Sequence, residues 1–440
     1  MRRVATFAAV LAVLALGATA VGGAATVRPA GSAGKTTITF WVGFTGRELG
    51  VVKGVVAQFE KSHPAIDVKT VGGISDDKIV AAIRSGTAPD AVQSFSSDNT
   101  GSFCSTGAWI DLASYMKRDH MSASIFPKAP AYYTQFKGTR CALPMLADVY
   151  GLYYNKALLA KAHITHPPRT IAELTADAKR LTKRDAKGNI TVLGFNPFLG
   201  WYENAEAHLA PMFGARWTDA KGHSALNTPA WRKLLTWQRK LVDWYGYSNL
   251  VRFNAKAGDE WSASNAFERG KVAMHLDGEW RVAFIADEHP ELKYGTAPLP
   301  TSSKMLYGSG YTSGSIVGIP KTASHKDEAW QLVKYVATNV KAEATLSNEL
   351  RNVPTISSAL HSKLIKPDRQ FATFLTIFAN THTTTTPVTA AGAAYQDLFS
   401  TWTAKWQAGK VKTKDLAAGL KNVDEQIDAQ LANQTGGGVP

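Results

Sequence analysis

The chain has 440 residues, of which 45% are hydrophobic and 19% charged, and it carries a formal net charge of +14. This composition is that of a soluble globular protein with enough apolar residues for substantial cores, and the length favours two domains. A basic chain of this kind could bind nucleic acid or an anionic surface. Its lysines and arginines are scattered, however, with no block of five or more. We therefore interpret the charge as a solvated surface and expect no nucleic-acid partner.

Residues 1–25 have the pattern of a secretory signal peptide. Arg2 and Arg3 precede an apolar stretch that carries no charge until Arg28, and small residues lie around Ala18-Thr19-Ala20. An uncleaved membrane anchor is the alternative, because the apolar run is long enough to span a bilayer. No cysteine lies near this segment, so the pattern indicates export to the periplasm, the cell surface or the medium without lipid attachment.

Strand and helix patterns alternate over the region that follows. Thr45 and Glu48 have the spacing of a capping box, in which two side chains satisfy free backbone donors at a helix start. This alternation is typical of a parallel sheet with helices on its faces. The expected order is a strand at 35–44, a helix from the capping box to residue 63, a strand at 66–71, a helix at 76–85 and a strand at 90–95.

The pattern changes after residue 138, where short strands precede a helix. The segment AMHLDGEWRVAF predicts a strand that ends at Leu276, a turn at Asp277-Gly278 and a helix from about Glu279. Residues 432–440 predict a disordered tail. The other helices are expected at 170–183, around 202–211, at 229–245, at 260–269 and, after a strand, within 313–338.

Sequence motifs for catalysis and for cofactor binding are absent from the chain. It has no Gly-x-Ser-x-Gly, His-Glu-x-x-His or P-loop motif. The glycine-rich stretch at 308–314 opens a strand and not a helix, so it is not a dinucleotide fingerprint. His163 and His166 have a metal-ligand spacing but lie beside two prolines in an expected loop. We therefore predict neither a cofactor nor a metal site.

Aromatic residues at strand ends and turns are the most informative feature. In an open α/β sheet, ligands bind beyond the carboxyl ends of the strands. Core packing is the alternative for each residue taken singly, whereas the set with its polar neighbours is typical of a ligand site. The aromatic residues are Trp41, Tyr150, Trp201, Tyr202, Trp280 and Tyr311, and the polar neighbours are Arg47, Asp98, Asp148 and Glu203.

Several longer segments resemble the bacterial extracellular solute-binding proteins of the carbohydrate, or maltose-binding-protein-like, type. The segments GLYYNKALLAKA, FERGKVAMHLDGEWRVAF, KYGTAPLP, IVGIPKTASHKDEAWQLVKYVA and NVPTISSAL follow one another in the order of that family. The resemblance extends from about Lys35 to Leu431. It implies an α/β fold of two hinge-linked lobes around a cleft that binds sugar. It also implies delivery of the sugar to the membrane permease of an ATP-binding-cassette importer.

The lobes are expected to be discontinuous in sequence. Strand–helix alternation breaks near Asp148, and a glycine-rich stretch near Gly308 marks a second crossing. Lobe 1 is therefore expected to comprise residues 35–147 and 308–354, and lobe 2 residues 148–307 and 355–431.

The resemblance also implies roles for individual residues. By position, Trp280 falls on the stacking tryptophan of the family's Gly-x-Trp turn, and Asp148 falls on a cleft carboxylate. Asp98 falls near a second cleft carboxylate, and Trp201 and Tyr202 fall in the family's aromatic segment. We include Arg47, Glu203 and Tyr311 in the expected ligand site because of their positions beside these groups.

The chain's only two cysteines are Cys104 and Cys141. An oxidising compartment permits one bridge between them, and two buried free thiols are the alternative. In the family, the two segments that hold these cysteines lie close together, so the resemblance implies a disulfide.

The sequence predicts a non-enzymatic, monomeric binding protein for a neutral mono- or oligosaccharide. Tryptophans offer stacking surfaces for the CH faces of sugars, and carboxylates accept hydrogen bonds from their hydroxyls. One alternative is a secreted glycoside hydrolase, which also needs aromatics beside paired carboxylates. The other is a binding protein for an anionic ligand such as a sugar phosphate, which the basic net charge suggests.

Overall fold

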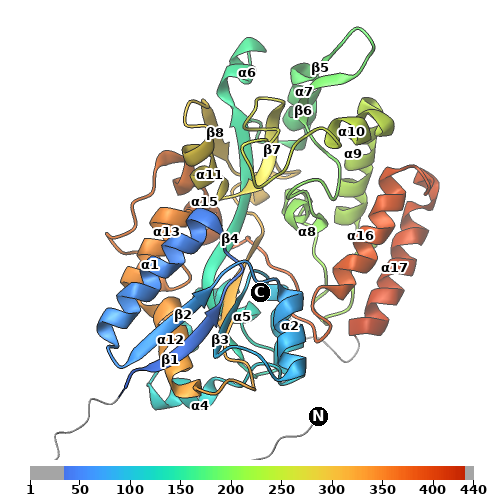
Figure 1. Cartoon of the computed structure of the whole chain (residues 1–440). Helices are drawn as coiled ribbons and strands as arrows, with labels where there is room; N and C mark the ends of the chain where they lie inside the picture. The colour runs from blue at the N-terminus through green and yellow to red at the C-terminus, as the bar shows by residue number, and fades with distance from the viewer. Residues whose placement is uncertain (1–33, 432–440) are drawn as a thin grey trace, which may run out of the picture.

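The computed structural model of the chain describes residues 34–431 (Figure 1). The predicted signal peptide and the predicted tail at 432–440 lie outside the described residues. The strands are β1 (Thr36–Trp41), β2 (Ile66–Val71), β3 (Ala91–Ser94), β4 (Ala142–Asn155), β5 (Lys183–Arg184), β6 (Ile190–Phe195), β7 (Val272–Gly278), β8 (Tyr294–Ala297) and β9 (Thr312–Gly318). The helices are α1 (Gly46–Ser62), α2 (Asp76–Ser85), α3 (Thr100–Ser105), α4 (Ala113–Arg118), α5 (Lys128–Tyr133), α6 (Lys156–Lys161), α7 (Ile171–Leu181), α8 (Glu206–Leu209), α9 (Pro229–Tyr245), α10 (Tyr247–Asn254), α11 (Arg281–Glu288), α12 (Lys326–Thr338), α13 (Val340–Leu350), α14 (Ser357–Leu360), α15 (Arg369–Ala379), α16 (Ala394–Gln407) and α17 (Leu416–Leu431).

The strands form one continuous path in the order β2-β1-β3-β9-β4-β7-β6-β5, with β8 also paired to β4. The long strand β4 joins the two halves of this path. Its residues 142–149 pair with β9, whereas residues 150–155 pair with β7 and β8. Figure 1 shows β4 running from one half of the molecule into the other. This buried strand is therefore one of the connections between the two halves.

Each half has its own hydrophobic core. The first core joins β1, α1, α12 and α13, and the second joins β4, β6, β7, α9 and α16. The molecule is therefore a two-lobed α/β protein, as the sequence predicted. Representative buried side chains are Ile38, Val52, Phe59, Leu332 and Leu346 in the first core, and Leu152, Leu193, Trp231, Met274 and Phe399 in the second.

The chain also crosses between the halves after α13. Ala147 and Val353 exchange backbone hydrogen bonds of 2.9 and 3.1 Å, which tie this crossing to β4. Beyond it, Ile356 still packs in the first core, although the sequence placed 355–431 in the second lobe. Val388, from the threonine-rich loop before α16, also packs in a small cluster of the first half.

Two predicted helices are absent or shorter in the structure. No helix forms over residues 260–269. There the side chain of Asp259 accepts the Trp261 amide and that of Asn265 accepts the Phe267 amide, so local side-chain bonds replace the helical ladder. The helix expected around 202–211 is reduced to α8, followed by a 3₁₀ turn, because Tyr202 has a φ of 48°.

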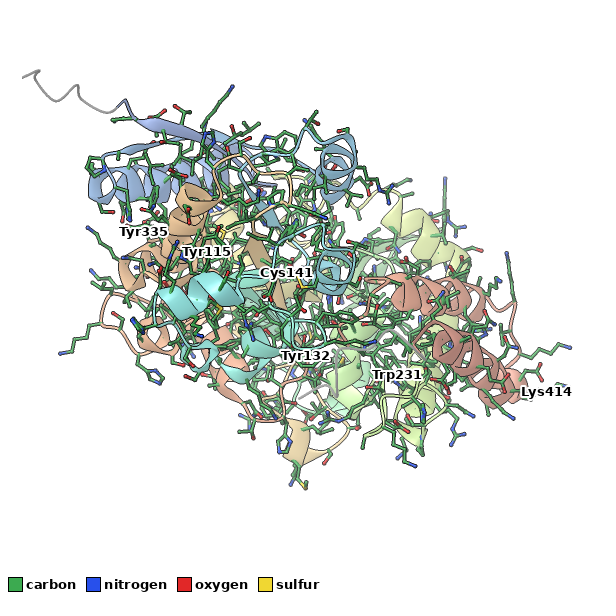
Figure 2. The ribbon with its side chains drawn as sticks, turned by 90° about the horizontal axis from the view of Figure 1, so that it is seen from below. Tyr115, Tyr132, Cys141, Trp231, Tyr335 and Lys414 are labelled. Carbon is green, nitrogen blue, oxygen red and sulfur yellow. A yellow bond between two sulfur atoms is a disulfide. The ribbon has the colours of Figure 1, made fainter. Side chains whose placement is uncertain are left out.

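The disulfide between Cys104 and Cys141 is present, which confirms the predicted pairing (Figure 2). It links α3 to the start of β4, and the two sulfur-bearing residues lie 37 positions apart in sequence. Both cysteines belong to the small cluster that also contains Phe103, Trp109 and Val388.

Candidate functional site

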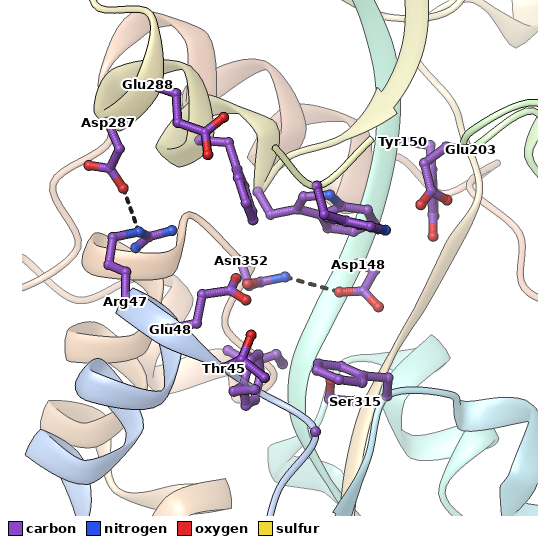
Figure 3. A pocket seen from close by; sticks show the side chains of 18 residues that line it. Thr45, Arg47, Glu48, Asp148, Tyr150, Glu203, Asp287, Glu288, Ser315 and Asn352 are labelled. Atoms are coloured by element: carbon purple, nitrogen blue, oxygen red, sulfur yellow. Dashed lines mark hydrogen bonds and ion pairs between the residues drawn. The ribbon is translucent and has the colours of Figure 1, made fainter. Parts of the chain in front are cut away.

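A cleft of about 810 Å³ lies between the two cores. Its walls come from both halves of the sheet, and Asp148 and Asn352 lie where the chain crosses between them (Figure 3). One wall is formed by Gly43, Phe44, Thr45, Gly46, Arg47, Glu48, Phe95, Leu146 and Ser315, and the other by Tyr150, Glu203, Trp261, Trp280, Phe284, Asp287 and Glu288.

Trp280 lines this cleft at the end of β7. The strand continues through Asp277 and Gly278, which pair with Gly151 and Tyr150. The predicted turn at Asp277-Gly278 is therefore wrong, and the chain turns one step later, before α11. The strand continues because Asp277 is buried and held by its side-chain hydrogen bonds.

Gly278 determines how the indole of Trp280 lies. A Cβ atom on Gly278 would come 2.2 Å from Cη2 of the Trp280 ring. The indole therefore folds back onto the strand end, where only glycine leaves room for it. Trp280 is 9% exposed, and its Nε1 has no hydrogen-bond partner.

Other aromatic rings extend this surface. The ring of Tyr150 meets that of Trp280 edge to face, with centroids 5.5 Å apart. The centroid of the Trp261 ring lies 6.1 Å from that of Trp280. Trp261 is 52% exposed. Trp261 was not among the expected site residues because a helix was predicted at 260–269, although a tryptophan in the polar stretch GDEWSAS was a signal. On the opposite wall, the half-exposed ring of Phe95 lies against Gly43.

Asp148 is joined to Glu279 through the amide of Asn352. The Asn352 Nδ2 group donates to Asp148 Oδ1 at 3.0 Å and to Glu279 Oε1 at 2.9 Å. Glu279 Oε2 also accepts the backbone amide of Val149 at 2.6 Å. Burial raises the pKa of Asp148 to about 7 and also raises the pKa of Glu279. Sequence reasoning placed Asp148 in the site but overlooked Glu279 and Asn352.

Glu203 faces the cleft beside a stacked pair of rings. The imidazole of His208 stacks on Tyr150 with centroids 3.7 Å apart, and its Nδ1 lies 3.7 Å from a Glu203 carboxylate oxygen. Burial lowers the pKa of His208 to about 4, so the ring is neutral at pH 7. Burial, together with the charges of Asp277 and Asp148, raises the pKa of Glu203 to about 8.

The loop before α1 brings charged groups to the cleft. Thr45 precedes the helix as predicted, but its side chain makes no cap bond, so the predicted capping box does not form. Glu48 instead projects into the cleft (Figure 3), and burial raises its pKa. Arg47 reaches across to Asp287 on α11 with a 2.5 Å contact, and it also donates to the carbonyl of Glu349 at 2.9 Å.

Four predicted site residues lie outside the cleft lining. Asp98 accepts hydrogen bonds from Thr386 and Gln396 and so anchors the threonine-rich loop. Tyr311 is buried, and its hydroxyl bonds to Thr386 at 3.0 Å. The other two are Trp201 and Tyr202, whose rings stack with centroids 4.0 Å apart. Both rings contact the imidazole of His275 on β7.

Within residues 34–431, no three histidine, cysteine, aspartate or glutamate side chains are arranged to hold a metal ion. In the same part of the chain, no helix is both long and apolar enough to cross a membrane.

Comparison of the sequence with known proteins identifies the family of this chain. The sequence model for bacterial extracellular solute-binding protein matches residues 46–343. The chain belongs to this family. Its members are binding proteins and not enzymes, so the alternative of a secreted glycoside hydrolase is not supported.

Individual relatives are proteins that bind sugars. A maltotriose-binding protein of Pyrococcus abyssi is 24% identical over 346 residues, which cover 76% of this chain and 70% of the relative. A maltooligosaccharide ABC transporter solute-binding lipoprotein of Streptococcus pneumoniae is 23% identical over 349 residues, which cover 75% of each chain. Among solved structures, CpMnBP1 with mannotriose bound has a TM-score of 0.78 and 27% identity over 89% of this chain and all of that one.

Proposed function

We propose that this solute-binding protein captures a mono- or oligosaccharide in the cleft and delivers it to an ATP-binding-cassette importer. The observation that carries the proposal is the indole of Trp280 in a cleft whose opposite sides belong to separate cores. Its volume of about 810 Å³ lies in the range of roughly 300–1,000 Å³ common for small-molecule sites. The sugar-bound and sugar-binding relatives support this class of ligand.

The proposed binding mode uses two kinds of contact. The free face of Trp280 stacks on a sugar ring, and the half-exposed Trp261 extends the stacking surface. Asp148 and Glu203 accept hydrogen bonds from sugar hydroxyls. Because both carboxyl groups are partly or wholly protonated at neutral pH, they can also donate.

The lining of the cleft argues against the anionic ligand suggested by the net charge. Five carboxyl groups line the cleft, and Arg47, its one lining cation, is already paired with Asp287. An anionic sugar phosphate would meet these acidic groups and would find no unpaired cation among the lining residues. The positive charge of the chain therefore belongs to its surface and not to its ligand site.

We further propose that the lobes close around the ligand by bending at the crossings in β4, between β8 and β9, and near residue 353. We take the lobe boundaries from the predicted ranges but assign residues 355–359 to lobe 1, where Ile356 packs. Val388 of the threonine-rich loop also packs in the first half. Hinge closure is the expected motion of such a protein. Arg47 and Asp287 face one another from α1 and α11, so this pair joins the two lobes at the mouth of the cleft.

A thermal-shift screen of mono- and oligosaccharides tests the proposal. A sugar present at 100 times its dissociation constant should stabilise the protein by about 2.7 kcal/mol. The same sugars incubated with the protein should yield no new reducing ends. A screen in which no carbohydrate raises the melting temperature would contradict the proposed function.

A further inference from the structure

The ionisable groups that line the cleft are mostly acidic, whereas the chain as a whole is basic. The whole sequence carries +14. The cleft is lined by one cation, Arg47, and by the carboxyl groups of Glu48, Asp148, Glu203, Asp287 and Glu288. Arg47 is paired with Asp287, and its charge also acts on Glu48, where burial raises the pKa more than Arg47 lowers it.

The residues packed behind the cleft lining include further carboxyl groups, and the arginine among them is already paired. Arg281 is fully buried, but its guanidinium contacts Asp277 at 2.7 Å and Glu268 at 3.1 Å, and a third carboxylate, Glu260, lies 3.9 Å away. It is therefore already surrounded by three acids. Glu279, also fully buried, has only the neutral Asn352 amide and a backbone amide as hydrogen-bond partners.

Several carboxylates that face the cleft lack a partner. Among the described residues, Glu48 makes no hydrogen bond or ion pair, and Glu288 has a buried oxygen, Oε2, without a partner. Beside Glu203, His208 lies 3.7 Å away and is neutral at pH 7. The charge of Arg281 opposes the rise that burial causes in the Glu203 pKa, but that guanidinium is shared with Asp277, Glu268 and Glu260. Burial keeps Asp148 and Glu203 partly protonated in the free protein, and a ligand cation placed between them would favour their ionised forms.

The aromatic wall of the same cleft also suits a cation. The ring face of an indole attracts an ammonium group, and the attraction grows when water is excluded. Trp280 is more than nine-tenths buried yet lines the cleft with an unpartnered Nε1, and Trp261 lies beside it. Carboxylates and indole faces thus surround one space from two sides.

From this arrangement we infer that the ligand is an amino sugar that carries a protonated primary amine, such as an oligomer of glucosamine, and that its ammonium group binds between Trp280, Asp148 and Glu203. This inference rests on the proposed function and specifies its ligand class. A hydroxyl can hydrogen-bond a carboxylate, but only a cation also offsets its charge. N-acetylation would remove that charge while keeping the sugar ring.

Calorimetric titration with matched sugars tests the inference. The ligands are glucosamine di- to tetramers, the N-acetylglucosamine oligomers of equal length, and neutral glucose and mannose oligomers. The free-amine series should bind at least tenfold more tightly than the acetylated series. Binding should weaken at high salt for the amine series only.

Variants localise the effect. Glu203→Gln should lower the affinity for the amine series at least tenfold more than it lowers the affinity for neutral sugars, which lose only one hydrogen-bond acceptor. Glu48→Gln, at a less buried position, repeats the test if Glu203→Gln fails to fold. The control is Asp67→Asn, an exposed residue of β2 outside the cleft, which should change neither affinity.

The outcomes separate the two claims. Neutral or acetylated sugars that bind as tightly as the amines would overturn the inference and leave the proposed function intact. An amine preference that persists unchanged in both glutamine variants would also overturn it. Failure of every sugar to bind would overturn both.

Discussion

At the scale of single residues, Trp280 shows how a glycine two positions away can shape a binding surface. The indole lies on the Cα of Gly278, so any larger residue there would push the ring off the strand end. Sequence reasoning placed Trp280 in the ligand site and Gly278 in a turn. In the structure Gly278 is still part of β7, and the ring of Trp280 packs against it.

Replacing Trp280 by alanine should weaken sugar binding by about 1–3 kcal/mol, by analogy with other aromatic stacking platforms. Titration of the purified variant with the best sugar of the screen measures this loss. Trp244→Ala is the matched control, because Trp244 is similarly large, 41% exposed and outside the cleft. If the Trp280 variant binds sugar as tightly as the wild type, Trp280 is not the ring on which the sugar stacks. A stability loss of about 3–5 kcal/mol would mark the residue as core instead.

Glu203 should make the stability of the ligand-free protein depend on pH. Burial raises its pKa from 4.5 to about 8. Between these values the folded state keeps a proton that the unfolded state has lost, so stability should fall as pH rises from about 4.5 to 8 and then level off.

Glu203→Gln removes this loss, so the variant should gain stability relative to wild type between pH 5 and pH 8. The expected gain exceeds about 1 kcal/mol, since each pKa unit corresponds to about 1.4 kcal/mol. Urea unfolding at both pH values measures it, and the exposed Glu425→Gln should show no such trend. A stability difference that stays constant with pH would refute this role of Glu203.

At the scale of elements, local patterns predicted regular segments well and failed where side chains compete with the backbone. The bounds of β2, α2 and α9 were predicted as the structure has them, because their apolar spacing and terminal residues agree. The expected helix at 260–269 failed because Asp259 and Asn265 bind nearby amides. Glu48 was expected in a capping box, yet it faces the cleft.

The link between α3 and β4 should be a main source of stability for the first lobe. Replacing Cys104 and Cys141 together by serine opens a loop of 37 residues and should cost about 3–4 kcal/mol in the free energy of unfolding. Sugar affinity should change little, because neither cysteine lines the cleft. Denaturant unfolding and titration of the double variant measure both quantities. A variant as stable as the oxidised wild type would show that the bridge contributes nothing.

At the scale of the whole molecule, the site is assembled from segments that are distant in sequence. Asn352 lies 204 positions from Asp148 and 73 from Glu279, yet one amide joins the two carboxylates. Periodicity and motifs cannot reveal such neighbours, because they report only local structure. Resemblance to a family supplied the lobes and the cleft. It did not supply Trp261, Asn352 or the acidic character of the lining, because these depend on which side chains the fold brings together.

The central claim is that sugar binds between the lobes at this cleft. A crystal structure with the tightest-binding sugar of the screen tests it most directly. We predict a sugar ring stacked on Trp280, with polar groups of the ligand within hydrogen-bond distance of Asp148 and Glu203. We also predict that the two lobes lie closer together than in sugar-free crystals. A sugar bound elsewhere on the molecule, with the cleft empty, would contradict the account.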